Sequence, residues 1–150
     1  MPEDRGDEFT PHTCVGQPFA DIGRTGRMAI LGFGEPVSWE APSGAGSLTG
    51  SRYALHVSCP FRVTQGTRIV VGSEDLRRAG GASFDRGAAA LDGYLARVAP
   101  LVEAVRVAPT GDLRIDIQHG IAVEVFPATP SRAEAWRLLE RFGTHVAFPA

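Results

Sequence analysis

The chain has 150 residues and a formal net charge of −2, and 43% of its residues are hydrophobic. This length fits one globular domain that buries about 70% of its unfolded surface. The charge argues against a general nucleic-acid binder, and no apolar run reaches the length of a membrane-spanning helix. All 15 cationic side chains are Arg, with no Lys and no Asn. We interpret this composition as the coding bias of a G+C-rich genome rather than as a binding signal.

The N-terminal residues 1–13 are acidic and predict a disordered segment, followed by a single domain over 14–150. A signal peptide would be basic and then apolar, so we expect a cytoplasmic protein. Cys14 and Cys59 show neither CxxC spacing nor a companion His, so we predict no metal site and no cofactor. In a reducing compartment we expect both thiols to be free, with Cys59 in the core.

A short apolar strand is predicted at 28–33, ended by the turn residues at 34–36. Residues 41–51 are rich in Gly and Ser and predict a flexible loop inside the domain. Loops of this length are either functional or merely tolerated, and both alternatives stay open.

Residues 52–71 predict a β-hairpin, because apolar and polar residues alternate along both halves. A three-residue loop ending at Gly66 keeps one face apolar and puts this glycine in the left-handed region. The same register sets Arg62 opposite Arg68 with no carboxylate between them, which is destabilising. Pro60 removes a ladder donor, so we expect the first strand to be an edge or to be bulged there. An edge can accept a strand from a partner.

Two interpretations of the facing arginines remain. In the first, solvent or an intramolecular carboxylate such as Glu74 or Asp75 relieves the repulsion. In the second, Arg62, Arg68 and His56 share the polar face and form a strip that accepts anionic groups of a protein or nucleic-acid partner.

Helical signals follow the first hairpin. Residues 73–78 predict one helical turn, with acidic residues at its start and arginines at its end. Residues 84–98 place apolar side chains on one helical face, and Pro100 stops the run. Gly87 and Gly93 weaken this helix, so packing must hold it.

The second hairpin is predicted within 102–126, with a three-residue loop at 118–120. This register keeps one face apolar and sets Arg114 opposite Glu124, a complementary pair with a structural role. Asp116 faces no charge in this register, so it is free to serve a partner.

The last predicted helix covers 131–142, with Ser131 and Glu134 as a capping box and Gly143 as its C-cap. Residues 144–148 either return as a short strand or lie across the sheet. The apolar residues of this helix that we expect to be buried are Trp136, Leu139 and Phe142.

Together these elements predict an α+β fold. Its sheet is mostly antiparallel and built from the hairpins at 52–71 and 102–126. Two helices, at 84–98 and 131–142, are expected to pack on one face of that sheet.

Several segments carry a resemblance to a known family: a Gly-Arg segment at 23–27, a Leu-His-x-x-Cys-x-aromatic-Arg strand at 55–62, a Gly-Ser-x-Asp turn at 72–75, and Glu-Val-Phe-Pro at 124–127 before a Trp-Arg pair at 136–137. The chain from residue 15 to about 139 resembles the YxiG-like family of small bacterial proteins. One departure is Phe61, where Trp is common. Some relatives are linked with contact-dependent toxin loci, so the resemblance implies an immunity or inhibitor protein that binds a cognate toxin domain.

Three functions are consistent with the sequence. The first is a non-enzymatic protein-binding module, in narrower form an immunity protein, with His56, Arg62, Arg68 and Asp116 on its partner-binding face. The second is a small hydrolase or nuclease, although no oxyanion motif and no metal triad is visible. The third is a structural subunit that docks through its Gly-rich loop and an exposed sheet edge. The residues that the second function would use are His56, Ser58, Asp75, His119 and Glu124.

Overall fold

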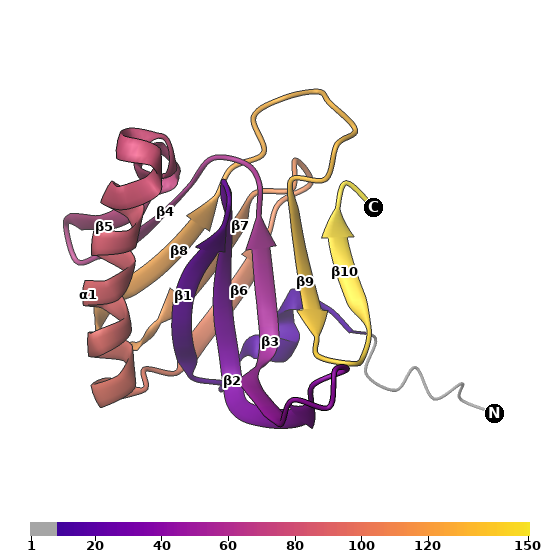
Figure 1. The fold of residues 1–150 in the computed structure, drawn as a ribbon. Coiled ribbons are helices and arrows are strands. Elements are labelled where there is room, and N and C mark those ends of the chain that lie inside the picture. The colour runs from indigo at the N-terminus through magenta and orange to yellow at the C-terminus, as the bar shows by residue number, and fades with distance from the viewer. Residues whose placement is uncertain (1–8) are drawn as a thin grey trace.

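Two five-stranded antiparallel sheets pack around one core in the computed structural model, which describes residues 9–150 (Figure 1). The first sheet has the order β1 (Phe19–Thr25), β2 (Met28–Glu40), β3 (Ser47–Val57), β9 (Trp136–Glu140), β10 (His145–Phe148). The second sheet has the order β5 (Arg68–Gly72), β4 (Phe61–Gln65), β8 (Ile121–Val125), β7 (Leu113–Ile117), β6 (Val102–Val107). The helical elements are α1 (Ala82–Val98) and the 3-10 turns η1 (Pro11–Cys14), η2 (Ser73–Leu76), η3 (Arg78–Gly81) and η4 (Gln118–Gly120). The predicted α+β class is therefore confirmed, with two sheets and one α-helix in residues 9–150.

The core is made by the apolar half of each alternating strand. Both sheets contribute side chains that are essentially inaccessible to solvent, and α1 adds a third group. The largest of these side chains are Phe19, Phe33, Phe84, Leu31, Leu55, Leu95, Leu113, Ile117 and Leu138. Each buried methylene contributes on the order of 0.8 kcal/mol, so this shared interior is the main term that holds the two sheets together.

The predicted helix at 84–98 is present as α1, with its apolar face buried. It does not lie on the face of one sheet. It contacts β1 and β5, the edge strands of the two sheets, and so covers one side of the sandwich (Figure 1). The Asp92 carboxylate of α1 accepts a hydrogen bond from the Ile22 backbone N–H of β1 at 2.8 Å, which satisfies a donor that an edge strand leaves unpaired.

The predicted helix at 131–142 is wrong, because β9 occupies this part of the chain. Trp136 and Leu138 point into the core with period 2, and β9 pairs with β3 on one side and β10 on the other. The expected cap residue Ser131 instead accepts a hydrogen bond from the Ala133 N–H in the preceding loop. Phe142 is 79% exposed at the β9–β10 turn rather than buried.

The predicted first hairpin is also wrong in its first half. β3 ends at Val57, the chain crosses from the first sheet to the second over 58–60, and β4 begins at Phe61. Pro60 lies in this crossover rather than inside a strand. Neither flanking strand is an edge, since β3 lies between β2 and β9 and β4 between β5 and β8.

The β4–β5 hairpin has a different register from the predicted one. Gln65 pairs with Arg68 across a two-residue loop, and Gly66 takes a φ of +61° there. A bulge at Val70 then brings Val63 opposite Val71, so two apolar residues face each other, although the predicted register had paired Val63 with Thr67. Arg62 consequently lies opposite Gly72, and the predicted contact between two arginines does not form.

The second hairpin matches the prediction pair for pair. Leu113 to Ile117 align with Val125 to Ile121 around the three-residue loop at 118–120. The loop residues His119 and Gly120 both have positive φ.

The first sheet extends further than the sequence predicts, since β2 continues past a bulge at Phe33 to Glu40 and β3 begins at Ser47. The connection between them covers 41–46. Of the predicted disordered segment, residues 1–8 lie outside the described residues, whereas η1 has buried Pro11 and Cys14 side chains.

Candidate functional site

The four residues predicted to bind a partner do not share one face. His56 lies on β3 in the first sheet, where it alternates with buried Leu55 and Val57 and therefore points away from the core. Burial among its neighbours lowers the pKa of this imidazole. Arg68 is exposed near the tip of the β4–β5 hairpin. The strip proposed from His56, Arg62 and Arg68 is therefore not assembled.

Arg62 and Asp116 do lie on one face, the outer surface of the second sheet, within a row of alternating charges. Glu124 joins Arg62 at 3.2 Å and Arg114 at 3.4 Å. Asp116 joins Arg114 at 2.9 Å and Arg106 at 3.6 Å. The predicted Arg114–Glu124 pair is thus confirmed, and Asp116 is paired rather than free. Each pair is partly exposed and is worth about 0–1 kcal/mol, so we assign this row to the structure of the sheet.

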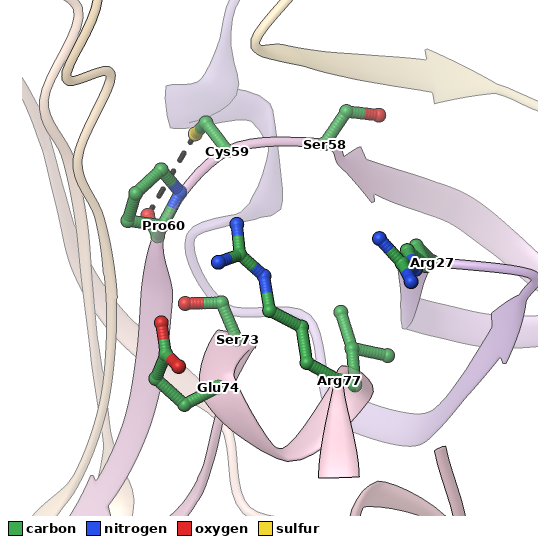
Figure 2. Close-up of a pocket in the computed structure, with 8 residues that line it drawn as sticks. Arg27, Ser58, Cys59, Pro60, Ser73, Glu74 and Arg77 are labelled. Carbon is green, nitrogen blue, oxygen red and sulfur yellow. Dashed lines mark hydrogen bonds between the residues drawn. The ribbon is translucent and has the colours of Figure 1, made fainter. Parts of the chain in front are cut away.

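A more distinctive arrangement occurs where the chain crosses between the sheets. The crossover over 58–60 forms one wall of a cavity of about 200 Å³ (Figure 2). The crossover is held at both ends, because the Ser58 N–H donates to the Ala135 carbonyl at 2.8 Å and the Phe126 N–H donates to the Pro60 carbonyl at 2.8 Å. Such anchoring fixes the wall before any ligand arrives. We call this cavity the crossover pocket; its lining residues are Arg27, Ser58, Cys59, Pro60, Ser73, Glu74, Leu76 and Arg77.

The opposite wall is the η2 turn, which two of its own side chains hold in place. The Ser73 hydroxyl accepts a hydrogen bond from the Phe61 N–H at 3.1 Å and so ties η2 to the start of β4. The Asp75 carboxylate accepts from the Gly72 N–H at 2.9 Å and caps the turn. Asp75 is therefore occupied by a structural role.

Two arginines from distant parts of the chain meet at this pocket. Arg27 lies in the turn between β1 and β2, and Arg77 directly follows η2. Figure 2 shows the Arg77 guanidinium extended among the lining residues, with Arg27 on the side opposite to Pro60 and Ser73. Within residues 9–150, the ion pairs involve other arginines and leave these two without a carboxylate partner.

The charges of the pocket favour an anionic ligand. Its lining holds two arginines and one carboxylate, that of Glu74, which gives a formal charge of +1. Neither arginine lies within ion-pair distance of Glu74 in the described residues. An Arg guanidinium presents a planar fork of donors that matches a carboxylate or a phosphate.

In the described residues, no hydrogen bond joins a nucleophilic side chain of the pocket to a base, and the Glu74 carboxylate is not bonded to Ser58, Cys59 or Ser73. Burial raises the pKa of the Cys59 thiol to about 11, so this thiol is protonated at neutral pH. Neither His nor Asp lines the pocket beside Ser58 and Ser73. The hydrolase residues suggested by the sequence do not converge either, since His56 and Glu124 lie on the outer faces of different sheets. Among the described residues, no cluster of three His, Cys, Asp or Glu side chains could hold a metal ion.

Sequence reasoning did not bring Arg27 and Arg77 together. Arg77 was explained by its place at the end of a helical turn, and Arg27 stood only inside the Gly-Arg segment. Residues from three motif segments of the sequence, at 23–27, 55–62 and 72–75, line the crossover pocket, but nothing in their spacing connects them.

Comparisons with family models, with curated proteins and with solved structures find no match for this chain. None of the helices in the described part of the chain is long and apolar enough to cross a membrane.

Proposed function

We propose that this protein is a non-enzymatic protein-binding module and that the crossover pocket receives an acidic side chain of its partner. The observation that carries the proposal is the pair Arg27 and Arg77, which face one cavity without a carboxylate partner in the described residues. Charge-assisted hydrogen bonds to a carboxylate are about twice as strong as neutral ones.

The size of the pocket supports a side chain rather than a free cofactor as the ligand. Sites for small molecules usually have volumes of about 300–1,000 Å³. The crossover pocket, at about 200 Å³, falls below this range. The raised pKa of Cys59 supports binding over thiol chemistry. In its narrower form the proposal makes the partner a bacterial toxin domain that this protein inhibits, as the family resemblance implies.

The test is affinity capture from a native lysate with three baits of the full chain. The wild type is compared with Arg27→Glu/Arg77→Glu and with the control Arg68→Glu/Arg78→Glu, which changes the net charge equally on exposed arginines outside the pocket. We expect one protein to bind the wild type and the control but not the pocket variant. Retention by the pocket variant and loss from the control would contradict the proposal and place the interface near the hairpin.

A fourth bait, Glu74→Gln, removes the negative charge of the pocket lining. We expect it to retain more of the same partner, because the acidic side chain no longer meets a like charge. If the captured protein is a toxin domain, stoichiometric inhibition of its activity by the wild type, but not by Arg27→Glu/Arg77→Glu, supports the immunity role.

A further inference from the structure

A second cavity shares the crossover wall with the crossover pocket. It has a volume of about 280 Å³ and also touches Ser58, Cys59 and Pro60. Its far side is the loop between β8 and β9, which rises at the same end of the sandwich as the crossover (Figure 1). The rest of its lining includes Pro127, Ala128, Glu134, Ala135 and Phe148.

The two cavities differ in chemistry. Apart from the shared wall, the second cavity is bounded mainly by proline, alanine and phenylalanine side chains. Its one charged residue, Glu134, is already paired with Arg137 at 2.6 Å. The arginines lie only in the crossover pocket. A ligand that fills both cavities must therefore be anionic at one end and apolar at the other.

We propose that the two cavities together read an extended segment of the partner protein, in which an acidic residue and an apolar residue stand two positions apart. This inference rests on the proposed function, since it assigns the acidic residue to Arg27 and Arg77. Both cavities touch all three residues of the wall, so one backbone segment separates them. Neighbouring backbones lie about 5 Å apart, and in an extended chain residues i and i+2 are about 7 Å apart with side chains on the same side, which is enough to reach over such a segment. A segment lying across Ser58 to Pro60 therefore lowers one such side chain into each cavity.

The rigidity of the wall favours this mode of binding. Its two backbone hydrogen bonds at 2.8 Å, from Ser58 to Ala135 and from Phe126 to Pro60, tie it to the strand segments on both sides. Because the wall is already ordered, binding does not have to order it, which lowers the entropic cost of association. Pro60 itself offers no N–H to a partner, so recognition depends on the side-chain cavities rather than on strand addition.

The test measures the binding of four fluorescein-labelled nonapeptides to the full-length protein. All four have a Ser/Gly background. The Asp/Leu peptide has Asp at position four and Leu at position six, the Asp/Ser peptide has Ser in place of this Leu, and the Asn/Leu peptide has Asn in place of this Asp. The separated peptide has the composition of the Asp/Leu peptide, but its Asp and Leu stand five positions apart. Burial of the leucine is expected to make the Asp/Leu peptide bind about 10-fold tighter than the Asp/Ser peptide. The Asn/Leu and separated peptides should bind at least about 10-fold more weakly than the Asp/Leu peptide.

Two variants assign the effects to the cavities. Ala128→Phe at an exposed loop position fills the apolar cavity and should remove the advantage of leucine while leaving Asp-dependent binding intact. Arg77→Gln should remove the dependence on Asp. Thermal unfolding confirms that each variant is folded.

The outcomes separate the two proposals. The inference of a two-residue motif is overturned if leucine raises the affinity less than about twofold while binding still depends on Asp and on Arg77. The proposed function is then left standing. Two outcomes would overturn both the inference and the proposed function. One is an affinity that still depends on Asp in the Arg77→Gln and Arg27→Gln variants. The other is the absence of saturable binding up to about 5 mM peptide.

Discussion

The protonated thiol of Cys59 allows a quantitative test of whether this site is a binder or a thiol enzyme. A free thiol with a pKa of about 8.5 is about 9% thiolate at pH 7.5. With its pKa raised to about 11, Cys59 is about 0.03% thiolate, which is about 300-fold less. The higher pKa makes the thiolate itself about 10-fold more nucleophilic towards a disulfide. Together these two factors predict that Cys59 reacts about 30-fold more slowly than an unperturbed thiol.

The assay follows the reaction of the protein with the aromatic disulfide DTNB, using the same chain unfolded in urea as the reference. Peptide mapping separates the two thiols, because tryptic cleavage after Arg52 and Arg62 isolates Cys59 from Cys14. The rate for Cys59 should rise about 10-fold per pH unit up to about pH 10, without the plateau of a free thiol near pH 9. A folded-state rate equal to the unfolded one, or a plateau below pH 8, would contradict a protonated Cys59 thiol at neutral pH and make Cys59 a candidate nucleophile.

Three further predictions concern stability. In α1, Gly93→Ala should stabilise the protein by about 1 kcal/mol, or raise Tm by about 2–4 °C, because nothing lies within 4 Å of the added methyl group. Gly87→Ala should stabilise the protein less than Gly93→Ala, or destabilise it, because the added methyl group would lie 3.3 Å from the Val70 carbonyl oxygen. Equal increases in stability at the two sites would contradict the packing of α1 on β5. Ala99→Gly should stabilise by about 0.5–1 kcal/mol in urea unfolding, because Ala99 ends α1 with a φ of +47° that glycine adopts without strain; a loss of stability would argue against that cap. Burial lowers the pKa of His56 in the folded state. The unfolded state therefore binds more protons than the folded state at acidic pH, and the free energy of unfolding falls as the pH drops below about 6.5. His56→Gln should flatten this fall between about pH 7 and 5 in chemical denaturation, and an unchanged pH profile would show that other groups cause it.

Local patterns were sufficient to predict the second hairpin but not the first. In 113–125 both strands and their loop are contiguous, and only one register keeps the apolar residues on one face. In the first hairpin, a bulge at Val70 compensates for a shorter loop. A bulge changes the parity that the register argument assumes, so alternation alone could not detect it.

The segment 131–142 shows how tertiary pairing overrides a local helix signal. Its capping-box residues and apolar spacing fit a helix, yet Trp136 and Leu138 also alternate with Arg137 and Leu139 as in a strand. The pairing of β9 with β3 decides between these patterns, and this contact spans about 80 residues of sequence.

The candidate site was the least predictable part. Arg27 and Arg77 stand 50 positions apart, and no spacing rule connects them. They meet because the chain leaves the first sheet at Val57 and enters the second at Phe61. The alternation of apolar and polar residues continues through 58–60 as if in one strand, so the sequence gives no sign of a crossover or of a pocket beside it.

The most direct test of the crossover pocket as a carboxylate site is an NMR titration of the Arg Nε–H groups with N-acetyl-glutamate amide, with N-acetyl-glutamine amide as the uncharged control. We expect saturable shifts at Arg27 and Arg77 in the range of about 1–50 mM, none with the glutamine compound, and none at the exposed Arg68 and Arg78. Shifts that grow linearly and equally at all four arginines would show that the crossover pocket has no preference for a carboxylate and would contradict the proposed function.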